Sequence, residues 1–198
     1  MTNKETLKNT LKKAYSDWKA AYNRYADIDY AAAIDQMKMS GQRGMLPEAG
    51  KILSSASRTN FSDETEKYKA VCLDALSKYE EELSEERMKA PSEEAVRVLE
   101  VLKITGIPEK NAADKMQEYV DAYGDNYIFF NALKKIAEDG GLSVLGEHPL
   151  EEEKMNCDSM IENVKSTFNP VSAMARGFDA VQEYVFNMYA DTLIKSAD

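Results

Sequence analysis

The helical period of the apolar residues, kept along nearly the whole chain, is the feature that most limits how this sequence can fold. At the N-terminus these residues recur at steps of three and four: Leu7, Leu11, Tyr15, Trp18, Tyr22, Tyr25, Ile28 and Ala32. Such spacing places their side chains on one face of a helix. It predicts one long amphipathic helix from about Thr2 to Met37, with an unusually aromatic buried face.

Glycine and proline divide the rest of the chain into further segments of the same period. The segments span about 62–89, 92–106, 108–124, 125–140, 150–167 and the residues from 170 onward. Several begin at a residue that favours a helix start, such as Ser92, Asp125 or Pro170. The one alternating stretch, GLSVLG from Gly141 to Gly146, is too short and isolated to build a sheet. The sequence therefore predicts an all-α fold, a multi-helix antiparallel bundle of about six to seven helices with long N- and C-terminal helices.

The length of 198 residues is sufficient for one self-contained core, and we expect a single helical domain over residues 1–198. Within it, the stretch SGQRGMLPEAGKILSSASRTN is rich in turn-forming residues. This composition predicts an irregular basic connector at about 39–61. The pattern that follows predicts a compact three-helix segment at about 92–140.

Part of the three-helix segment has a local resemblance to a known family. Residues Val98 to Asp139 resemble a ubiquitin-associated domain in outline, with a short helix, a turn at Gly106-Ile107, a second helix, a glycine turn and a third helix. The second helix is longer than the family's, and Ile107 stands where the family has an aromatic residue. The resemblance therefore implies a three-helix arrangement and carries over no ubiquitin-binding residues.

The net charge of −10 is spread unevenly along the chain. Residues 1–60 contain ten lysines and arginines against six acids, whereas the remaining residues contain 15 against 29. An acidic body argues against general binding to nucleic acid or to anionic membranes. The basic N-terminal region leaves open the alternative that this region by itself binds nucleic acid.

The stretch GMLPEAGK, from Gly44 to Lys51, is similar to a phosphate-binding loop of the form G-x-x-x-x-G-K-[ST]. Five residues separate its glycines where the loop has four, and Ile52 stands where the loop has a hydroxyl for Mg²⁺. A long predicted helix precedes it, whereas the phosphate-binding loop follows a strand. We therefore expect no nucleotide binding at Lys51 and no other cofactor.

The single histidine, His148, limits the catalytic and metal-binding chemistry of the chain. One histidine cannot supply two Glu-x-x-His pairs or a His-Glu-x-x-His zinc site. Beside Pro149, it is expected at an exposed helix start and outside any catalytic triad. We accordingly expect no enzymatic activity and no metal site.

The two cysteines, Cys72 and Cys157, each lie within a helix-like pattern. We interpret both as reduced, buried thiols of a cytoplasmic protein. The N-terminal residues MTNKETLKNTLKK contain no apolar stretch of the kind found in signal peptides, and no run of about 18 apolar residues follows. No membrane association is expected.

Two charged patterns are candidates for a partner surface. They consist of the basic residues Lys4, Lys8, Lys12, Arg43, Lys51 and Arg58, and the acidic residues Glu81, Glu82, Glu85 and Glu86. Basic residues interleaved with aromatic ones can hold nucleic acid by phosphate pairing and stacking. Aromatic residues at helical spacing more often pack into a core, and we favour that interpretation here. The acidic run is interpreted as a solvated face, because no calcium loop accompanies it.

These observations favour a non-enzymatic, acidic helical interaction protein with an assembly, scaffold-like or inhibitory role and a protein partner. The long terminal helices also offer a surface for a homo-oligomer. The alternative hypothesis is a nucleic-acid-directed protein that binds through the basic N-terminal region or mimics nucleic acid with its acidic face. An unrecognised enzyme is the third hypothesis. A phage or mobile-element origin is a general expectation for motif-free helical chains of this size, and no residue of this sequence specifically indicates it.

Overall fold

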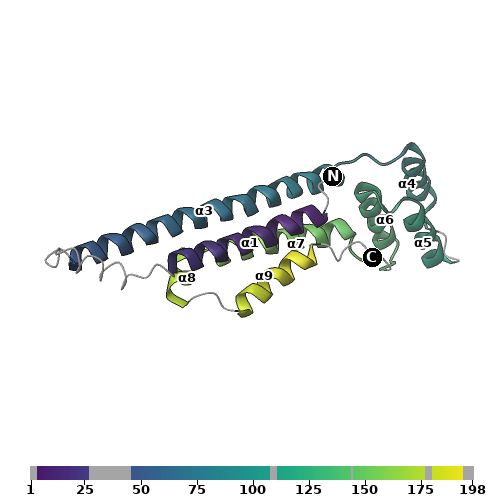
Figure 1. The fold of residues 1–198 in the computed structure, drawn as a ribbon. Helices are drawn as coiled ribbons and strands as arrows, with labels where there is room; N and C mark the ends of the chain where they lie inside the picture. The colour runs from purple at the N-terminus through teal and green to yellow at the C-terminus, as the bar shows by residue number, and fades with distance from the viewer. Residues whose placement is uncertain (1–3, 27–45, 108–110, 144, 177–179, 194–198) are drawn as a thin grey trace. The chain divides into compact units, whose positions relative to one another are not determined.

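The computed structural model of the chain describes residues 4–26, 46–107, 111–143, 145–176 and 180–193. All regular elements in these ranges are α-helices, and no strand occurs in them. Figure 1 shows them in chain order as α1 (Lys4–Ala26), α3 (Leu46–Arg87), α4 (Glu93–Thr105), α5 (Ala112–Tyr123), α6 (Tyr127–Asp139), α7 (Pro149–Thr167), α8 (Pro170–Arg176) and α9 (Ala180–Thr192). The all-helical prediction is confirmed.

The described residues form eight helices, so the predicted count of six to seven is too low. The difference arises at the C-terminus, where one long helix was predicted from residue 170. The structure has two shorter helices there, α8 and α9, and residues 177–179 between them lie outside the described residues.

The second difference is the start of α3. The sequence predicts an irregular connector up to residue 61, but α3 is already helical from Leu46. Pro47 lies in the first turn of α3, where its missing N–H removes no hydrogen bond of the helix. Ser62, near which the sequence predicts a new helix to begin, lies inside α3. Residues 27–45, which include the end of the predicted N-terminal helix and Gly44, lie outside the described residues.

The chain divides into two compact units, which we describe separately. Unit 1 is centred on residues 78–157, and unit 2 combines residues 3–77 with residues 158–195. Helices α3 and α7 each contribute residues to both units. The expectation of a single domain stays a prediction.

The core of unit 2 is aromatic and is built around Trp18, which is 0% exposed. The ring of Phe168 lies 4.7 Å from that of Trp18, and Phe186 stacks on Tyr15 at 4.7 Å. The indole N–H donates a hydrogen bond of 2.8 Å to the Thr65 hydroxyl, which itself donates to the Phe61 carbonyl oxygen at 2.7 Å. Tyr15 and Trp18 are therefore core residues, as the helical spacing predicts.

The core of unit 1 is a hydrophobic cluster shared by α4, α5 and α6. Its buried members are Ala95, Leu99, Leu102, Met116, Phe129, Leu133 and Ala137. The Ser92 hydroxyl caps α4 by accepting a hydrogen bond from the Ala95 N–H. At the start of α6 the capping residue is Asn126, one position after the predicted Asp125, and its side-chain oxygen accepts from the Phe129 N–H.

Candidate functional site

The basic candidates on α1 face the acidic residues of α9. Lys8 Nζ lies 2.7 Å from Asp191 Oδ1, and Lys12 Nζ lies 2.9 Å from the same oxygen. Further along α1, Lys19 pairs with Glu183 at 2.6 Å. The α1 row that suggested a partner surface is thus largely paired within unit 2.

The remaining basic candidates have different surroundings. Arg58 lies on α3 and is exposed. Arg43 lies outside the described residues; Lys51 is in α3, but its side chain is outside the described part. Lys4, at the start of α1, is half-buried. Among the basic candidates whose side chains are described, Arg58 is therefore the exposed one.

The ion pairs of Asp191 predict an acid-dependent contribution to stability. Hydrogen bonds from Lys8 and then Lys12 lower the pKa of Asp191 below its ordinary value of 3.8. A lowered folded-state pKa stabilises the fold above the ordinary value, and this stability is lost as the pH falls through the folded-state pKa. We expect Asp191→Asn to lower the free energy of unfolding at pH 7 by about 1 kcal/mol or less, because Asp191 is partly exposed.

The measurement is urea unfolding of both proteins at a series of pH values. The difference between wild type and Asp191→Asn should shrink toward zero below about pH 3, where both side chains are neutral. A difference that stays constant across the series would show that these ion pairs do not stabilise unit 2.

The acidic candidates lie at the C-terminal end of α3, in unit 1. Glu81 and Glu85 are exposed and one helical turn apart, and neither has an ion-pair partner within the described part of the chain. Met88 follows on the same face with 82% of its surface exposed. Glu82 and Glu86 are half-buried, and Glu86 lies 3.5 Å from Lys89. We call Glu81, Glu85 and Met88 the acidic face of α3.

The opposite side of this segment packs against α7. Tyr79 and Leu83 are each 3% exposed. The Tyr79 hydroxyl donates a hydrogen bond of 2.8 Å to buried Glu153. Burial and this bond raise the pKa of Tyr79 well above its ordinary value, so the hydroxyl keeps its proton and remains a donor. Glu80 adds an ion pair with Lys154 at 3.2 Å.

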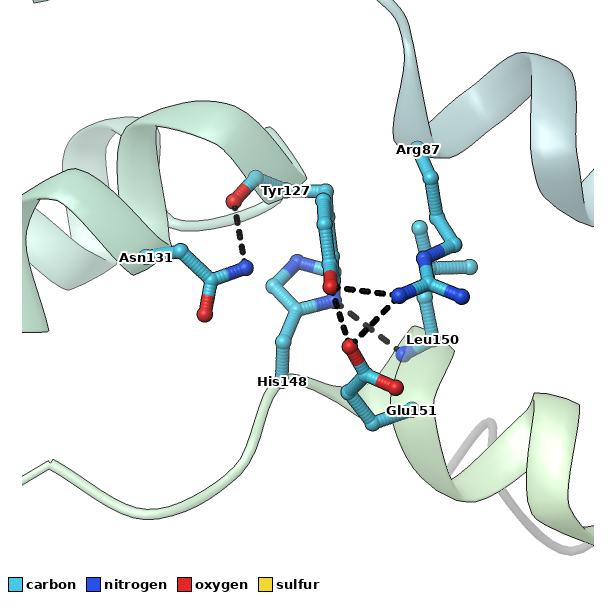
Figure 2. Close-up of polar contacts among 6 residues, drawn as sticks. All are labelled: Arg87, Tyr127, Asn131, His148, Leu150 and Glu151. Carbon is cyan, nitrogen blue, oxygen red and sulfur yellow. Dashed lines mark hydrogen bonds and ion pairs between the residues drawn. The ribbon is translucent and has the colours of Figure 1, made fainter.

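The last residue of α3, Arg87, joins the starts of α6 and α7 (Figure 2). Its Nη2 donates to the Tyr127 hydroxyl oxygen at 2.6 Å and to Glu151 Oε1 at 2.8 Å. The Tyr127 hydroxyl in turn donates to the same Glu151 oxygen. The guanidinium carbon also lies 4.6 Å from the centre of the Tyr127 ring, which is the geometry of a cation–π contact. We call Arg87, Tyr127 and Glu151 the Arg87 junction.

His148 packs edge-on against the Tyr127 ring at 5.3 Å and is 4% exposed. It lies at the start of α7 as predicted, but the prediction that it is exposed is wrong. Nδ1 accepts a hydrogen bond from the Leu150 N–H, which requires an unprotonated Nδ1, so Nε2 carries the proton and donates to the Gly124 carbonyl oxygen at 3.1 Å. Both ring nitrogens therefore bind backbone groups that connect the end of α5 to the start of α7.

An open groove of about 610 Å³ lies between α7 and α9 in unit 2. Its lining consists of Asp158, Ser159, Glu162, Asn163, Ser166 and Tyr189. Glu162 is already paired with Lys165 at 2.7 Å, and every lining residue is exposed or half-buried. The groove is open to solvent, whereas small-molecule sites are usually clefts that bury most of the ligand.

The sequence lists Glu81 and Glu85 as candidates, but it does not indicate the residues that hold this end of α3 in place. Arg87 lies 40 residues from Tyr127 and 64 from Glu151. Glu151 lies in the first turn of α7, and no local pattern in the sequence identifies its partner. The one sequence signal of the junction is Pro149, which fixes the start of α7.

Groups of three or more His, Cys, Asp or Glu side chains with metal-binding geometry do not occur among the described residues. Within the same ranges, no helix combines the length and apolar character needed to cross a membrane. Comparisons of the chain with protein-family models, with curated proteins and with solved structures found no match.

Proposed function

We propose that this protein is a non-enzymatic interaction protein that binds a basic surface of a partner protein through the acidic face of α3. The supporting observation is that residues of the two charged patterns differ in whether they form ion pairs within the chain. Lys8 and Lys12 pair with Asp191, whereas Glu81 and Glu85 have no ion-pair partner in the residues described. The acidic pattern therefore includes two exposed carboxylates, those of Glu81 and Glu85, whose charge is available to a partner.

The acidic face combines charge with an apolar contact. Carboxylates attract a basic partner and orient it during the encounter. Met88, which is exposed in the free chain, becomes buried against the partner and adds an apolar contribution to the affinity that salt does not screen. The segment is also held in place before binding, by Tyr79, Glu80 and the Arg87 junction. A surface fixed in advance loses little conformational entropy on association.

The nucleic-acid alternative divides into two forms. Binding through the basic helix needs free lysines and accessible rings, yet Lys8 and Lys12 are paired and Trp18 is 0% exposed. Mimicry of nucleic acid uses the acidic face itself and differs only in the partner, a nucleic-acid-binding protein with a basic groove. For the enzyme hypothesis, the occupied nitrogens of His148 leave no histidine base.

The architecture that goes with this proposal is an antiparallel bundle in unit 2. The order of the ion pairs supports it, because Lys12 pairs with Asp191 near the end of α9 and Lys19 pairs with Glu183 near its start. The two cysteines are buried and form no disulfide, which is compatible with a cytoplasmic location, and that location is part of the proposal.

The test is affinity capture from the native host with wild type and the double variant Glu81→Gln/Glu85→Gln. The matched control is Glu100→Gln/Glu138→Gln, which removes the same charge from two exposed glutamates elsewhere in unit 1. We expect wild type and control to retain the same partner, with retention falling as salt rises, and the Glu81/Glu85 variant to lose it. Equal retention by all three proteins would refute the proposal.

A partner that is retained in this way is then tested for nucleic-acid binding. If the chain displaces nucleic acid from that partner, the mimicry form of the proposal holds. If it does not, the chain acts as a protein-binding module without mimicry.

A further inference from the structure

The outward side of α9 carries a row of exposed apolar side chains. Val181 is 64% exposed, Tyr184 69% and Met188 43%. Their spacing of three and four residues places them on one helix face. The opposite face of α9 carries Phe186 and Ala190, both 0% exposed, and contacts α1. We call Val181, Tyr184 and Met188 the α9 row.

The α9 row differs from the other exposed apolar residues, most of which are isolated. Single apolar residues on a surface are normal, whereas an aligned set marks an interaction surface. On α4, Val101 and Ile104 form a pair that is 56% and 85% exposed, and the exposed Arg97 precedes them on the same face. The α9 row therefore has the length of a helix–helix contact, and the α4 pair provides a natural control.

The spacing of the α9 row makes it complementary to itself. In an antiparallel pairing of two copies, Tyr184 near the middle of the row lies opposite Tyr184 of the second copy. Val181 of each copy then lies beside Met188 of the other, offset by one residue along the helix. Such a two-fold arrangement is the commonest geometry of protein dimers, and it pairs every member of the row with an apolar residue.

The charges around α9 favour a second copy over a basic partner. Glu183 and Asp191 are the only charged residues in the sequence of α9, and both are paired with lysines of α1. A basic partner would find no uncompensated carboxylate on this helix. Two copies of a chain with net charge −10 repel each other in general, but at α9 they meet without opposed unpaired acids.

We propose that α9 is a homodimer interface in which two copies pack antiparallel through Val181, Tyr184 and Met188. This association is independent of the acidic face of α3, which lies in unit 1. The row covers one face of a helix of 13 residues, less than a standard interface, so we expect a reversible dimer with a dissociation constant in about the micromolar range.

Sedimentation equilibrium of the full chain from about 1 µM to about 1 mM tests the proposal. We expect wild type to pass from monomer to dimer over this range, and Tyr184→Ser/Met188→Ser to shift the transition at least about tenfold upward in concentration. The control Val101→Ser/Ile104→Ser should dimerise like wild type. Circular dichroism of each variant verifies that the helices are retained.

A second measurement tests the register. Tyr184 faces its own copy, so Tyr184→Cys should form a covalent dimer on mild oxidation, while Ile104→Cys should not. Cys72 and Cys157 are buried and do not compete. A monomer over the whole range, or a dimer insensitive to the change at Tyr184 and Met188, would overturn the inference. Capture of a basic partner would still succeed in that case, so the two proposals fail separately.

Discussion

Replacing Trp18 with alanine is expected to lower the free energy of unfolding by about 3 to 5 kcal/mol. The side chain is 0% exposed and contacts the rings of Phe168 and Phe61, so truncation leaves a cavity among rigid aromatic neighbours. It also removes the N–H that donates to Thr65. Urea unfolding followed by circular dichroism gives the change directly.

Two milder variants separate the contributions of packing and hydrogen bonding. Trp18→Phe keeps an aromatic ring, and should cost less than the alanine variant. Thr65→Val keeps the shape of the neighbour but leaves the indole N–H without an acceptor, with an expected cost of about 1 to 3 kcal/mol.

The opposite result would restore the stacking hypothesis. If Trp18→Ala unfolds like wild type but binds single-stranded nucleic acid more weakly by about 1 to 3 kcal/mol, the aromatic row of α1 is a binding platform. Its burial in the core of unit 2 makes the loss of stability the expected outcome.

Replacing Arg87 with alanine is expected to cost about 1 to 3 kcal/mol of unfolding free energy. The change removes hydrogen bonds to Tyr127 and Glu151 and the contact with the Tyr127 ring. The Glu151 carboxylate, whose side chain is 34% exposed, then keeps its charge without a cation beside it. The pKa of Arg87 is raised by its bond to Tyr127, so the guanidinium is charged at every pH of the assay.

Two controls accompany this measurement. Arg87→Lys keeps the charge but loses the planar group that spans both acceptors, so it should recover only part of the stability. Arg97→Ala removes an exposed arginine that lies 3.7 Å from Glu93, and should change stability by about 0.5 kcal/mol or less. Equal effects of Arg87→Ala and Arg97→Ala would show that the junction does not hold the end of α3.

Local patterns in the sequence were enough to predict the all-helical fold and the buried residues of α1 up to Trp18. Leu7, Leu11, Tyr15 and Trp18 are all buried, because period and burial are both properties of one short segment. The start of α3 was missed because glycine and serine only weaken a helix, while Pro47 is harmless in a first turn. Composition alone does not separate such a segment from a loop.

The functional assignments depend on contacts between distant segments, which no local pattern contains. Lys12 resembles a free basic residue until Asp191, 179 positions away, is placed beside it. His148 was expected to be exposed because histidine beside proline is common at helix starts, and its burial follows from Tyr127 and Phe130 on α6. Charge patterns in a sequence therefore identify candidate residues for a partner surface. Only the folded structure shows which of these residues form ion pairs within the chain and which remain available to a partner.

Each unit contains one buried thiol, and the reaction of that thiol with an alkylating reagent reports when the unit opens. Cys72 belongs to unit 2 and Cys157 to unit 1, and both are 0% exposed. Burial raises the pKa of Cys72 to about 12, so its reactive thiolate is scarce at neutral pH as long as the fold is closed. Alkylation of the native protein then proceeds only when a unit opens. Pulse labelling followed by mass spectrometry measures the alkylation rates of Cys72 and Cys157 in one sample of the wild-type protein. Equal rates would mean that the two units open together in one cooperative step.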